Sequence, residues 1–448
     1  MSKNIFFTKF SELSGERFDA PFFDSKHIEN INKIQQVNNT KLSNIVKFSS
    51  ESWNQKDYFD NEFPYVEISE IDLQTGNINN IKNVPKNEAP SRAKMIVRHN
   101  DIIISTTRPT RGAISLIKTD DILIASTGFA VIRTYSDKIK KEYLFNCLKM
   151  PIILNQFEQR SSGGNYPAIT LEELSKVIIP LPSLEIQNQI ISIMDSAYIL
   201  KTKKEQEAKE KLASIDKYLL SELGIEFQEK EKETLEQRVF TRKFSEVSSN
   251  RFDSQFNSNN IYKDINSKYP IEIFKNINES IQTGLPIRKD CREVEGKYPY
   301  YGANGIIGYM NEYTHDGEYL VIGQDGYIGN HYVVNEKFWA SNHNWVIKIK
   351  DGIDIYYVKY FLDVWNYDYL ITGGVIPKIT KDAVNTINIP LPPIDIQNKI
   401  VAYIQALRDE AKALEKEAKE VYGNAKKEVE AIILQSDKNE ERLSFTKS

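Results

Sequence analysis

The chain has 448 residues, of which 40% are hydrophobic and 27% charged, and its formal net charge is −4. This length predicts two or three domains, and the composition is that of a soluble globular protein. No run approaches the roughly 20 apolar residues of a membrane span, and the N-terminus has no signal-peptide pattern. The only cysteines, Cys147 and Cys291, lie far apart. They fit a cytoplasmic protein and argue against a disulfide framework or a structural zinc site.

The opening segment of the chain recurs past its middle. FTKFSE at 7–12 is followed by RFD at 17–19, and FTRKFSE at 240–246 is followed by RFD at 251–253, 234 residues after the first RFD. Each half also closes on one block of GG, IT, IPLP and IQN, at 163–188 and again 210 residues later. The inserts between these shared ends differ, and the second is 24 residues shorter. Matching ends with divergent inserts predict one scaffold that carries two different recognition domains.

Both inserts have a mixed α/β pattern. Short apolar runs bounded by Gly, Asp and Ser predict strands, in the first insert at 65–69, 101–105 and 122–125 and in the second at 319–323 and 345–349. Amphipathic segments near 142–158 and 355–370 predict helices.

Each Pro-Leu-Pro block ends a strand-like run, at 177–179 and 387–389, because proline cannot donate to a sheet. A long helical pattern follows each block. The second has a heptad seam, which is the line of apolar side chains facing a partner helix: Ile404, Leu407, Ala411, Leu414, Ala418, Val421, Ala425, Val429 and Ile432.

The first helical pattern is less regular. Its seam consists of Met194, Ala197, Ala208, Ile215 and Leu219. It is interrupted by Lys201, Lys204 and Lys211, so we expect Leu200 and Leu212 to share the burial. One such helix cannot bury its own apolar stripe, and the other helix is the simplest partner. Packing of each helix on its own domain is the alternative.

These patterns give the following boundaries: a first recognition domain at 1–182, a first long helix at 183–223, a charged linker at 224–239, a second recognition domain at 240–392, a second long helix at 393–434 and a tail at 435–448.

The repeat, the Pro-Leu-Pro blocks and the helical seam together resemble the specificity subunit of a type I restriction-modification system. Further matching pieces are YVEIS at 65–69, ASTGF at 125–129 and YYGANG at 300–305. The lysine-interrupted first seam departs from the family pattern and leaves the register of that helix open. The resemblance implies an α+β fold with an internal pseudo-two-fold repeat, in which two mixed α/β target-recognition domains alternate with two long helices that pair as an antiparallel coiled coil.

The resemblance also implies function and partners. Each domain would read one half of a bipartite site in double-stranded DNA, and the helices would set the gap and dock two methyltransferase subunits. Motor-nuclease subunits would be optional partners, and the resemblance implies no interaction with a membrane. S-adenosylmethionine, ATP and Mg would be bound by the partner subunits and not by this chain.

Motifs for catalysis are missing from the sequence. The amino-methyltransferase signature, Asn or Asp followed by Pro-Pro and an aromatic residue, does not occur, and neither does a Walker A loop. The sequence therefore predicts a non-catalytic reader. The alternative is a coiled-coil scaffold that joins two protein-binding domains and never contacts DNA.

A DNA reader needs hydrogen-bonding side chains on loops and cations that reach phosphates. The net negative charge opposes this only weakly, because the local surface decides DNA binding. The candidates in the first half are Arg92, Lys94, Thr106, Thr107, Arg108, Arg111, Gly163, Gly164, Asn165 and Tyr166. Those in the second half are Tyr301, Asn304, Gln324, Asp325, Asn330, His331, Asn342, His343, Gly373, Gly374 and Lys378. Ordinary surface turns are the alternative for each of these residues.

Overall fold

The structure is a computed structural model that describes residues 20–54, 57–225, 265–287, 296–365, 370–372 and 377–435. The repeated openings at 7–19 and 240–256 lie outside these ranges, as do Gly373 and Gly374. The chain divides into two units, and each is described by itself: unit 1 is Met1–Glu205 with Glu415–Ser448, and unit 2 is Gln206–Leu414.

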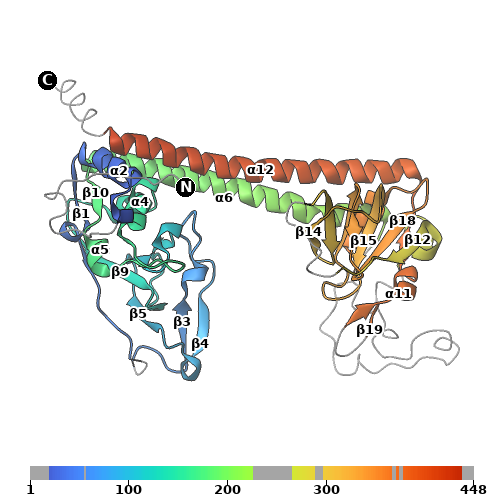
Figure 1. The fold of residues 1–448 in the computed structure, drawn as a ribbon, viewed down its shortest axis with the longest axis horizontal. Coiled ribbons are helices and arrows are strands. Elements are labelled where there is room, and N and C mark those ends of the chain that lie inside the picture. The colour runs from blue at the N-terminus through green and yellow to red at the C-terminus, as the bar shows by residue number, and fades with distance from the viewer. Residues whose placement is uncertain are drawn as a thin grey trace. The chain divides into compact units, whose positions relative to one another are not determined.

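Unit 1 contains one mixed α/β domain (Figure 1). Its strands are β1 (Asn39–Lys41), β2 (Val46–Phe48), β3 (Glu62–Val66), β4 (Lys82–Pro85), β5 (Ala93–Val97), β6 (Ile102–Ser105), β7 (Ile114–Leu116), β8 (Leu123–Ser126), β9 (Phe129–Tyr135) and β10 (Ile178–Pro180). Its α-helices are α2 (Ser25–Gln35), α3 (Lys141–Leu148), α4 (Pro151–Arg160), α5 (Leu171–Ser175) and the first part of α6 (Leu184–Leu223). Its 3-10 helices are η1 (Ala20–Phe23), η2 (Leu42–Asn44), η3 (Ile68–Glu70), η4 (Lys86–Glu88) and η5 (Pro109–Arg111).

Unit 2 contains the second mixed α/β domain. Its strands are β11 (Ile271–Ile273), β12 (Asn278–Thr283), β13 (Tyr298–Gly302), β14 (Gly305–Met310), β15 (Glu318–Gly323), β16 (His331–Asn335), β17 (Trp339–Ala340), β18 (Asn344–Ile349), β19 (Ile371–Thr372), β20 (Lys378–Ile379) and β21 (Asn388–Pro390). Its helices are α9 (Phe274–Ile277), α10 (Ile355–Asp363), α11 (Lys381–Asn385) and the first part of α12 (Ile394–Leu434).

The sheets of the two units have matching topology. One sheet of each unit is antiparallel throughout, with the order β2-β9-β6-β7 in unit 1 and β12-β18-β15-β16 in unit 2. A second sheet contains one parallel pair, β3–β8 in unit 1 and β13–β17 in unit 2. Strand β5 extends this sheet in unit 1 alone among the described residues, consistent with the longer first insert. The internal repeat predicted from the shared ends is thus present in the fold, and the predicted α+β class is confirmed.

The Pro-Leu-Pro blocks connect each domain to its long helix by the same hydrogen bonds. Gln187, which is fully buried, accepts from the backbone N–H of Lys140 at 2.9 Å and donates to the carbonyl of Pro182 at 2.9 Å. Its counterpart Gln397 accepts from Asp354 N at 2.9 Å and donates to Pro392 O at 2.8 Å. The repeated IQN motif therefore encodes a buried amide that satisfies backbone groups where each helix begins.

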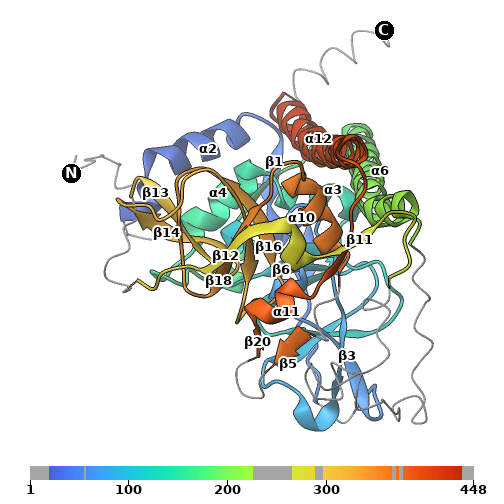
Figure 2. The same cartoon turned by 90° about the vertical axis from the view of Figure 1, so that its right-hand side faces the viewer.

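Within each unit, the segments of α6 and α12 lie side by side and antiparallel (Figures 1 and 2). Three cross-helix contacts give the register: Lys204 with Glu417 and Lys211 with Glu410, each 2.6 Å from N to O, and Tyr218 with Tyr403, 4.1 Å between ring centroids. Each step of seven residues along α6 matches a step of seven back along α12, which is the register of an antiparallel coiled coil.

One expectation for the first helix was wrong. Leu200 and Leu212 are 43% and 41% exposed, whereas Lys201 is 6% exposed and lies in the seam. Lys201 follows Met194 by seven residues and so continues the heptad spacing of the seam, because a lysine can bury its aliphatic stem. Its ammonium group is paired with Glu205 at 2.7 Å.

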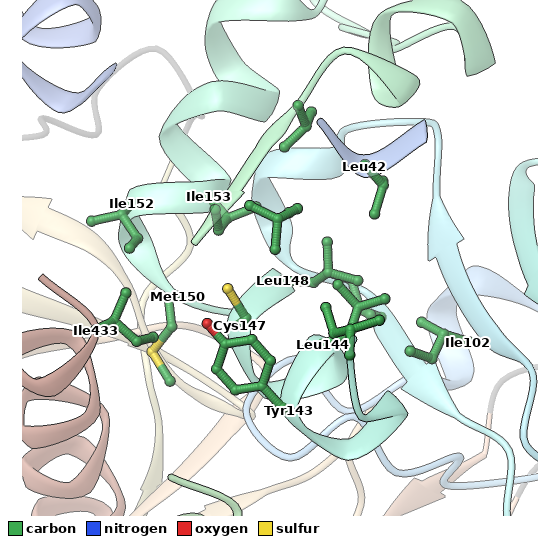
Figure 3. Close-up of a cluster of buried hydrophobic side chains, with 14 of the residues drawn as sticks. Leu42, Ile102, Tyr143, Leu144, Cys147, Leu148, Met150, Ile152, Ile153 and Ile433 are labelled. Atoms are coloured by element: carbon green, nitrogen blue, oxygen red, sulfur yellow. The ribbon is translucent and has the colours of Figure 1, made fainter. Parts of the chain in front are cut away.

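The core of unit 1 joins the recognition domain to the helix pair. Figure 3 shows Tyr143, Cys147 and Met150 beside Ile433 of α12, and all four are buried. In unit 2 the corresponding core contains Ile215 and Leu219 of α6 and Ile404 of α12. Both halves of the helix pair thus contribute side chains to a domain core.

Some element boundaries differ from the sequence-based expectation. The helix expected near 142–158 is two helices, because Pro151 takes the first turn of α4. The strand expected at 65–69 ends at Val66 and is followed by the 3-10 turn Ile68–Glu70. The helix expected near 355–370 ends at Asp363.

Candidate nucleic-acid interface

In unit 1 the structure brings together loops that are distant in sequence. We call residues 106–112, 127–128 and 162–168 the first loop cluster. Thr106 donates to the carbonyl of Gly128 from its backbone N–H at 2.8 Å and from its hydroxyl at 2.9 Å. Its own carbonyl accepts from Ile169 N at 2.9 Å, and Thr107 forms a β-bridge with Ala168. Three chain segments are therefore held by backbone hydrogen bonds around Thr106 and Thr107.

Arg108 lies at the centre of the first loop cluster. It has a left-handed backbone with φ 49°, a conformation that costs a non-glycine residue about 1 kcal/mol. Its backbone N–H donates to Pro167 O at 2.7 Å, and its Nη2 donates to Asn165 O at 3.2 Å. The guanidinium carbon lies 4.3 Å from the centre of the Tyr166 ring, and Tyr166 is 71% exposed. This places a cation stacked on an aromatic ring at the surface of the domain.

A buried lysine, Lys149, donates hydrogen bonds to the turn that carries Arg111 and to a neighbouring segment. Arg111 is exposed and is followed by Gly112 in the left-handed region, with φ 74°. The carbonyls of Gly112 and Leu73 accept from Nζ of Lys149 at 3.4 Å and 3.1 Å. Burial lowers the pKa of Lys149 to about 7, since it disfavours the charged ammonium form.

The Gly-Gly pair of the first half has two different roles. Gly163 has φ 102°, so the turn itself requires glycine. At Gly164 a Cβ atom would meet nothing within 4 Å, so the backbone is open to an approaching ligand. The neighbouring Asn165 is exposed.

Arg92 and Lys94 lie at the start of β5, beside this cluster. The carbonyl of Arg92 accepts from Thr127 N at 2.8 Å, and both side chains are exposed. Arg98, farther along the same segment, instead forms an ion pair with Glu51 at 2.6 Å. Arg92 and Lys94 are therefore exposed cations beside the first loop cluster, whereas Arg98 belongs to a charge network.

Unit 2 has an equivalent arrangement, which we call the second loop cluster (residues 302–305, 323–330, 341–343 and 378–379). Gln324 N donates to His343 O at 2.9 Å, and Ile379 N donates to Gln324 O at 2.9 Å. Asp325 forms a β-bridge with Lys378, as Thr107 does with Ala168 in unit 1. Gln324 and Asp325 therefore occupy the structural positions of Thr106 and Thr107.

The side chains of the second loop cluster are linked to one another. His343 Nδ1 lies 2.6 Å from Asp325 Oδ1, and the amide of Gln324 donates to the carbonyl of Asn342. Asn330 Nδ2 donates to Asn304 Oδ1 at 3.1 Å, which joins the β13–β14 turn to the cluster. These contacts bring together the predicted residues Asn304, Gln324, Asp325, Asn330, Asn342, His343 and Lys378.

Tyr301 and His331 lie in different surroundings from the other predicted residues. The Tyr301 hydroxyl donates to Glu336 at 2.9 Å, and its ring is stacked on Tyr332. The His331 side chain is 8% exposed, with Nδ1 2.7 Å from Gly329 O and Nε2 3.0 Å from Asp363 Oδ1. Both ring nitrogens of His331 already have a protein partner.

Sequence reasoning did not single out two further exposed residues of these clusters, Thr127 and Tyr327. The backbone N–H of Thr127 donates to Arg92 O at 2.8 Å, and no local pattern in the sequence predicts this pairing of distant segments. Tyr327 is 61% exposed in the tight loop that Gly323, Gly326 and Gly329 allow. The glycine spacing could have indicated an exposed loop tip.

The described ranges also lack the features of a metal site and of a membrane span. Nowhere in them do three or more His, Cys, Asp or Glu side chains gather as a metal site would require. None of the helices in the same part of the chain has the length and apolar character needed to cross a bilayer.

Comparison with known proteins gives concordant matches. A chain from a solved structure of a type I R-M system covers 89% of this chain and 96% of its own length, with 21% identity and a TM-score of 0.56, and it supports the fold. A Haemophilus influenzae protein named as a candidate type I restriction enzyme specificity subunit is 36% identical over 126 residues, which is 27% of this chain and 32% of that protein. The EcoprrI specificity subunit of Escherichia coli is 31% identical over 125 residues, 28% of this chain and 30% of that subunit.

The matched segments thus span only about a third of the length of these curated relatives. A family model described as the type I restriction modification DNA specificity domain, in contrast, matches residues 31–213 and 273–421, which is most of the chain. The chain belongs to the type I restriction modification DNA specificity domain family.

Proposed function

We propose that this chain is the DNA-recognition subunit of a type I restriction-modification complex, in which each domain reads one half of a bipartite site. One observation carries the proposal. The two loop clusters occupy equivalent positions on equivalent sheets, yet they present different side chains. A common framework with different exposed chemistry is what two unlike half-sites require.

The first loop cluster suits contacts with phosphates and guanine. It offers exposed cations and a turn where backbone can approach closely, and Arg can bond guanine O6 and N7. The proposed DNA contacts in unit 1 are Arg92, Lys94, Thr106, Thr107, Arg108, Arg111, Gly163, Gly164, Asn165 and Tyr166.

The second loop cluster is richer in amides, which can bond adenine N6 and N7 together. The proposed contacts in unit 2 are Asn304, Gln324, Asp325, Asn330, Asn342, His343 and Lys378. We leave Tyr301 and His331 out, because the His331 side chain is only 8% exposed and the Tyr301 hydroxyl bonds Glu336, which lies outside the second loop cluster.

The long helices would set the gap between the half-sites and dock two methyltransferase subunits. Support comes from the heptad register, because contacts between α6 and α12 recur at seven-residue intervals along both helices. Catalysis would belong to the partners, which would bind S-adenosylmethionine and, with motor-nuclease subunits present, ATP and Mg. Such a complex would act on the cytoplasmic DNA of its cell.

A comparison of adenine methylation in cells with and without this gene tests the proposal. We expect one bipartite methylated motif that disappears with the gene. The purified chain alone should transfer no methyl group. DNA binding by the assembled complex should weaken steeply with salt, since cation–phosphate contacts release counterions. A methylation pattern unchanged by the deletion, with salt-independent binding, would favour a scaffold that does not contact DNA.

A further inference from the structure

Asp363, at the end of α10, joins three elements of unit 2. Its carboxylate accepts from Lys359 Nζ of its own helix at 2.7 Å and from Arg408 Nη2 of α12 at 2.8 Å. The ring of His331, on β16, lies 3.0 Å away. Asp363 is itself only partly exposed, so water screens these contacts less than it screens a surface ion pair. One carboxylate thus connects the recognition sheet, its covering helix and the long helix.

Arg408 is held from two sides. Besides its ion pair with Asp363, its guanidinium carbon lies 4.7 Å from the centre of the Tyr360 ring. The Tyr360 hydroxyl in turn donates to Gln405, one helical turn earlier on α12, at 3.0 Å. Helix α12 is therefore attached to α10 at two neighbouring positions on one face.

Unit 1 has different chemistry at the corresponding place. The 210-residue repeat spacing pairs Tyr198 of α6 with Arg408 and Asp195 with Gln405. The equivalent bonds of Lys140 to Gln187 and of Asp354 to Gln397 align 140 with 354, so Asn146 and Lys149 correspond to Tyr360 and Asp363. Among the described residues, no ion pair joins a cation of α6 to an acid of the domain at this place. The Tyr198 hydroxyl accepts from Asn77 at 2.7 Å, and a pocket of about 300 Å³ lies between Asn146, Asp195 and Tyr198. At this place the helix of unit 1 contacts its domain through a neutral hydrogen bond beside a cavity, whereas the corresponding contact in unit 2 is an ion pair.

We propose that Arg408 and Asp363 are positioning residues that fix the second recognition domain on α12, and so limit which gap lengths the complex accepts. The inference rests on the proposed function, because a gap exists only where two half-sites are read. Asp363 reaches the second loop cluster only through His331, whose Nδ1 lies 2.7 Å from Gly329 O, and neither Arg408 nor Asp363 is a proposed DNA contact. We therefore expect them to influence the spacing and not the half-site sequence. A charge-assisted hydrogen bond is worth on the order of a tenfold change in an equilibrium constant. Removing it would let the domain move on its helix at a modest loss of binding.

The test uses the full chain in its complex and compares methylated motifs in cells. R408M removes the charge and keeps the volume, D363N removes the acceptor charge, and R408K keeps a cation. K416Q is the matched control, because Lys416 lies on the same helix with its side chain 76% exposed. We expect R408M and D363N to add motifs whose gap differs by one base pair, with both half-sites unchanged. R408K should add fewer such motifs, and K416Q none.

Purified complexes supply a second measurement that does not depend on methylation. The ratio of affinities for duplexes with the native gap and with a gap one base pair longer should fall roughly tenfold in R408M. An unchanged ratio in both R408M and D363N would overturn the inference, as would a changed half-site sequence. A wild-type complex without a bipartite motif would instead refute the proposed function, so the two failures are distinguishable.

Discussion

The two recognition domains differ most where they are exposed and least where they join the helices. Gln187 and Gln397 make the same buried bonds at the start of α6 and α12. At the loop clusters, in contrast, Thr106 and Thr107 are replaced by Gln324 and Asp325 on the same backbone positions. The comparison teaches that the framework is held by backbone hydrogen bonds, which leaves the exposed side chains free to vary without loss of the fold.

Charge networks are a second difference between the domains. In unit 1 Arg133 bonds both Asp101, which is 1% exposed, and Glu51, and Arg98 also pairs with Glu51. In unit 2 the network is centred on Asp363 and includes the long helix. One domain uses its charges to join its two sheets and the other to attach its helix.

The largest expected effect comes from removing the buried glutamines. Besides its other bonds, Gln187 donates to Lys138 O at 2.9 Å, so Q187L leaves three backbone groups unsatisfied and Q397L leaves two. Each unsatisfied buried group costs about 1–3 kcal/mol. We expect urea unfolding of the full chain to show a loss of about 3 kcal/mol or more in Q187L and a smaller loss in Q397L. Equal, negligible losses would mean that these amides do not hold the helix starts.

The next effect concerns DNA binding through the first loop cluster. R108A removes the cation stacked on Tyr166, and R111A removes an exposed cation on the same turn. We expect each variant complex to bind its DNA about tenfold more weakly. Where the removed arginine contacts a phosphate, the slope of log affinity against log salt concentration should also fall by about one. K203Q, in the exposed face of α6, is the control. Wild-type affinity and salt slope in both arginine variants would remove these residues from the interface.

A pH effect on stability is expected from Glu51 in unit 1. Hydrogen bonds from Arg98, and then from Arg133, outweigh burial and lower the pKa of Glu51 from 4.5 to about 2. The folded state thus favours the carboxylate, and this stabilisation is present above about pH 4.5 and is lost as the pH falls towards 2. The free energies of unfolding of wild type and E51Q should therefore differ at neutral pH and converge in acid. A difference that is constant with pH would contradict the assigned cause.

The smallest effect is expected from the charge pairs between the helices. Lys204 and Lys211 pair with Glu417 and Glu410, but the glutamate side chains are 54% and 57% exposed, so water and salt screen the attraction. K204Q and K211Q should unfold at nearly the wild-type urea concentration, whereas A418K, at a fully buried seam position, should unfold earlier. A large loss in the glutamine variants would mean that charge, and not the apolar seam, holds the helices together.

The sequence was sufficient for the parts of the fold that repeat. Spacing located both Pro-Leu-Pro blocks and both long helices, because proline and heptad patterns act locally along the chain. The sequence did not indicate that Lys201 belongs to the seam. A lysine at a seam position looks like an interruption, and only the structure shows that its stem is buried and its ammonium group is paired with Glu205.

The candidate site was less accessible from sequence. Arg108 and Tyr166 were named separately, and only the fold brings them within 4.3 Å. His331 was named with His343, although the first is enclosed and the second has a side chain that is 56% exposed. Such differences arise from pairing between distant strands, which no local pattern records.

The central claim is that the two domains read DNA independently on one framework. The most direct measurement is the methylated motif of cells in which residues 20–160 are replaced by the corresponding insert of a relative with a known, different half-site. Our account predicts that one half-site changes to that of the relative while the other half-site and the gap remain. A motif that stays unchanged, or one in which both half-sites change, would contradict it.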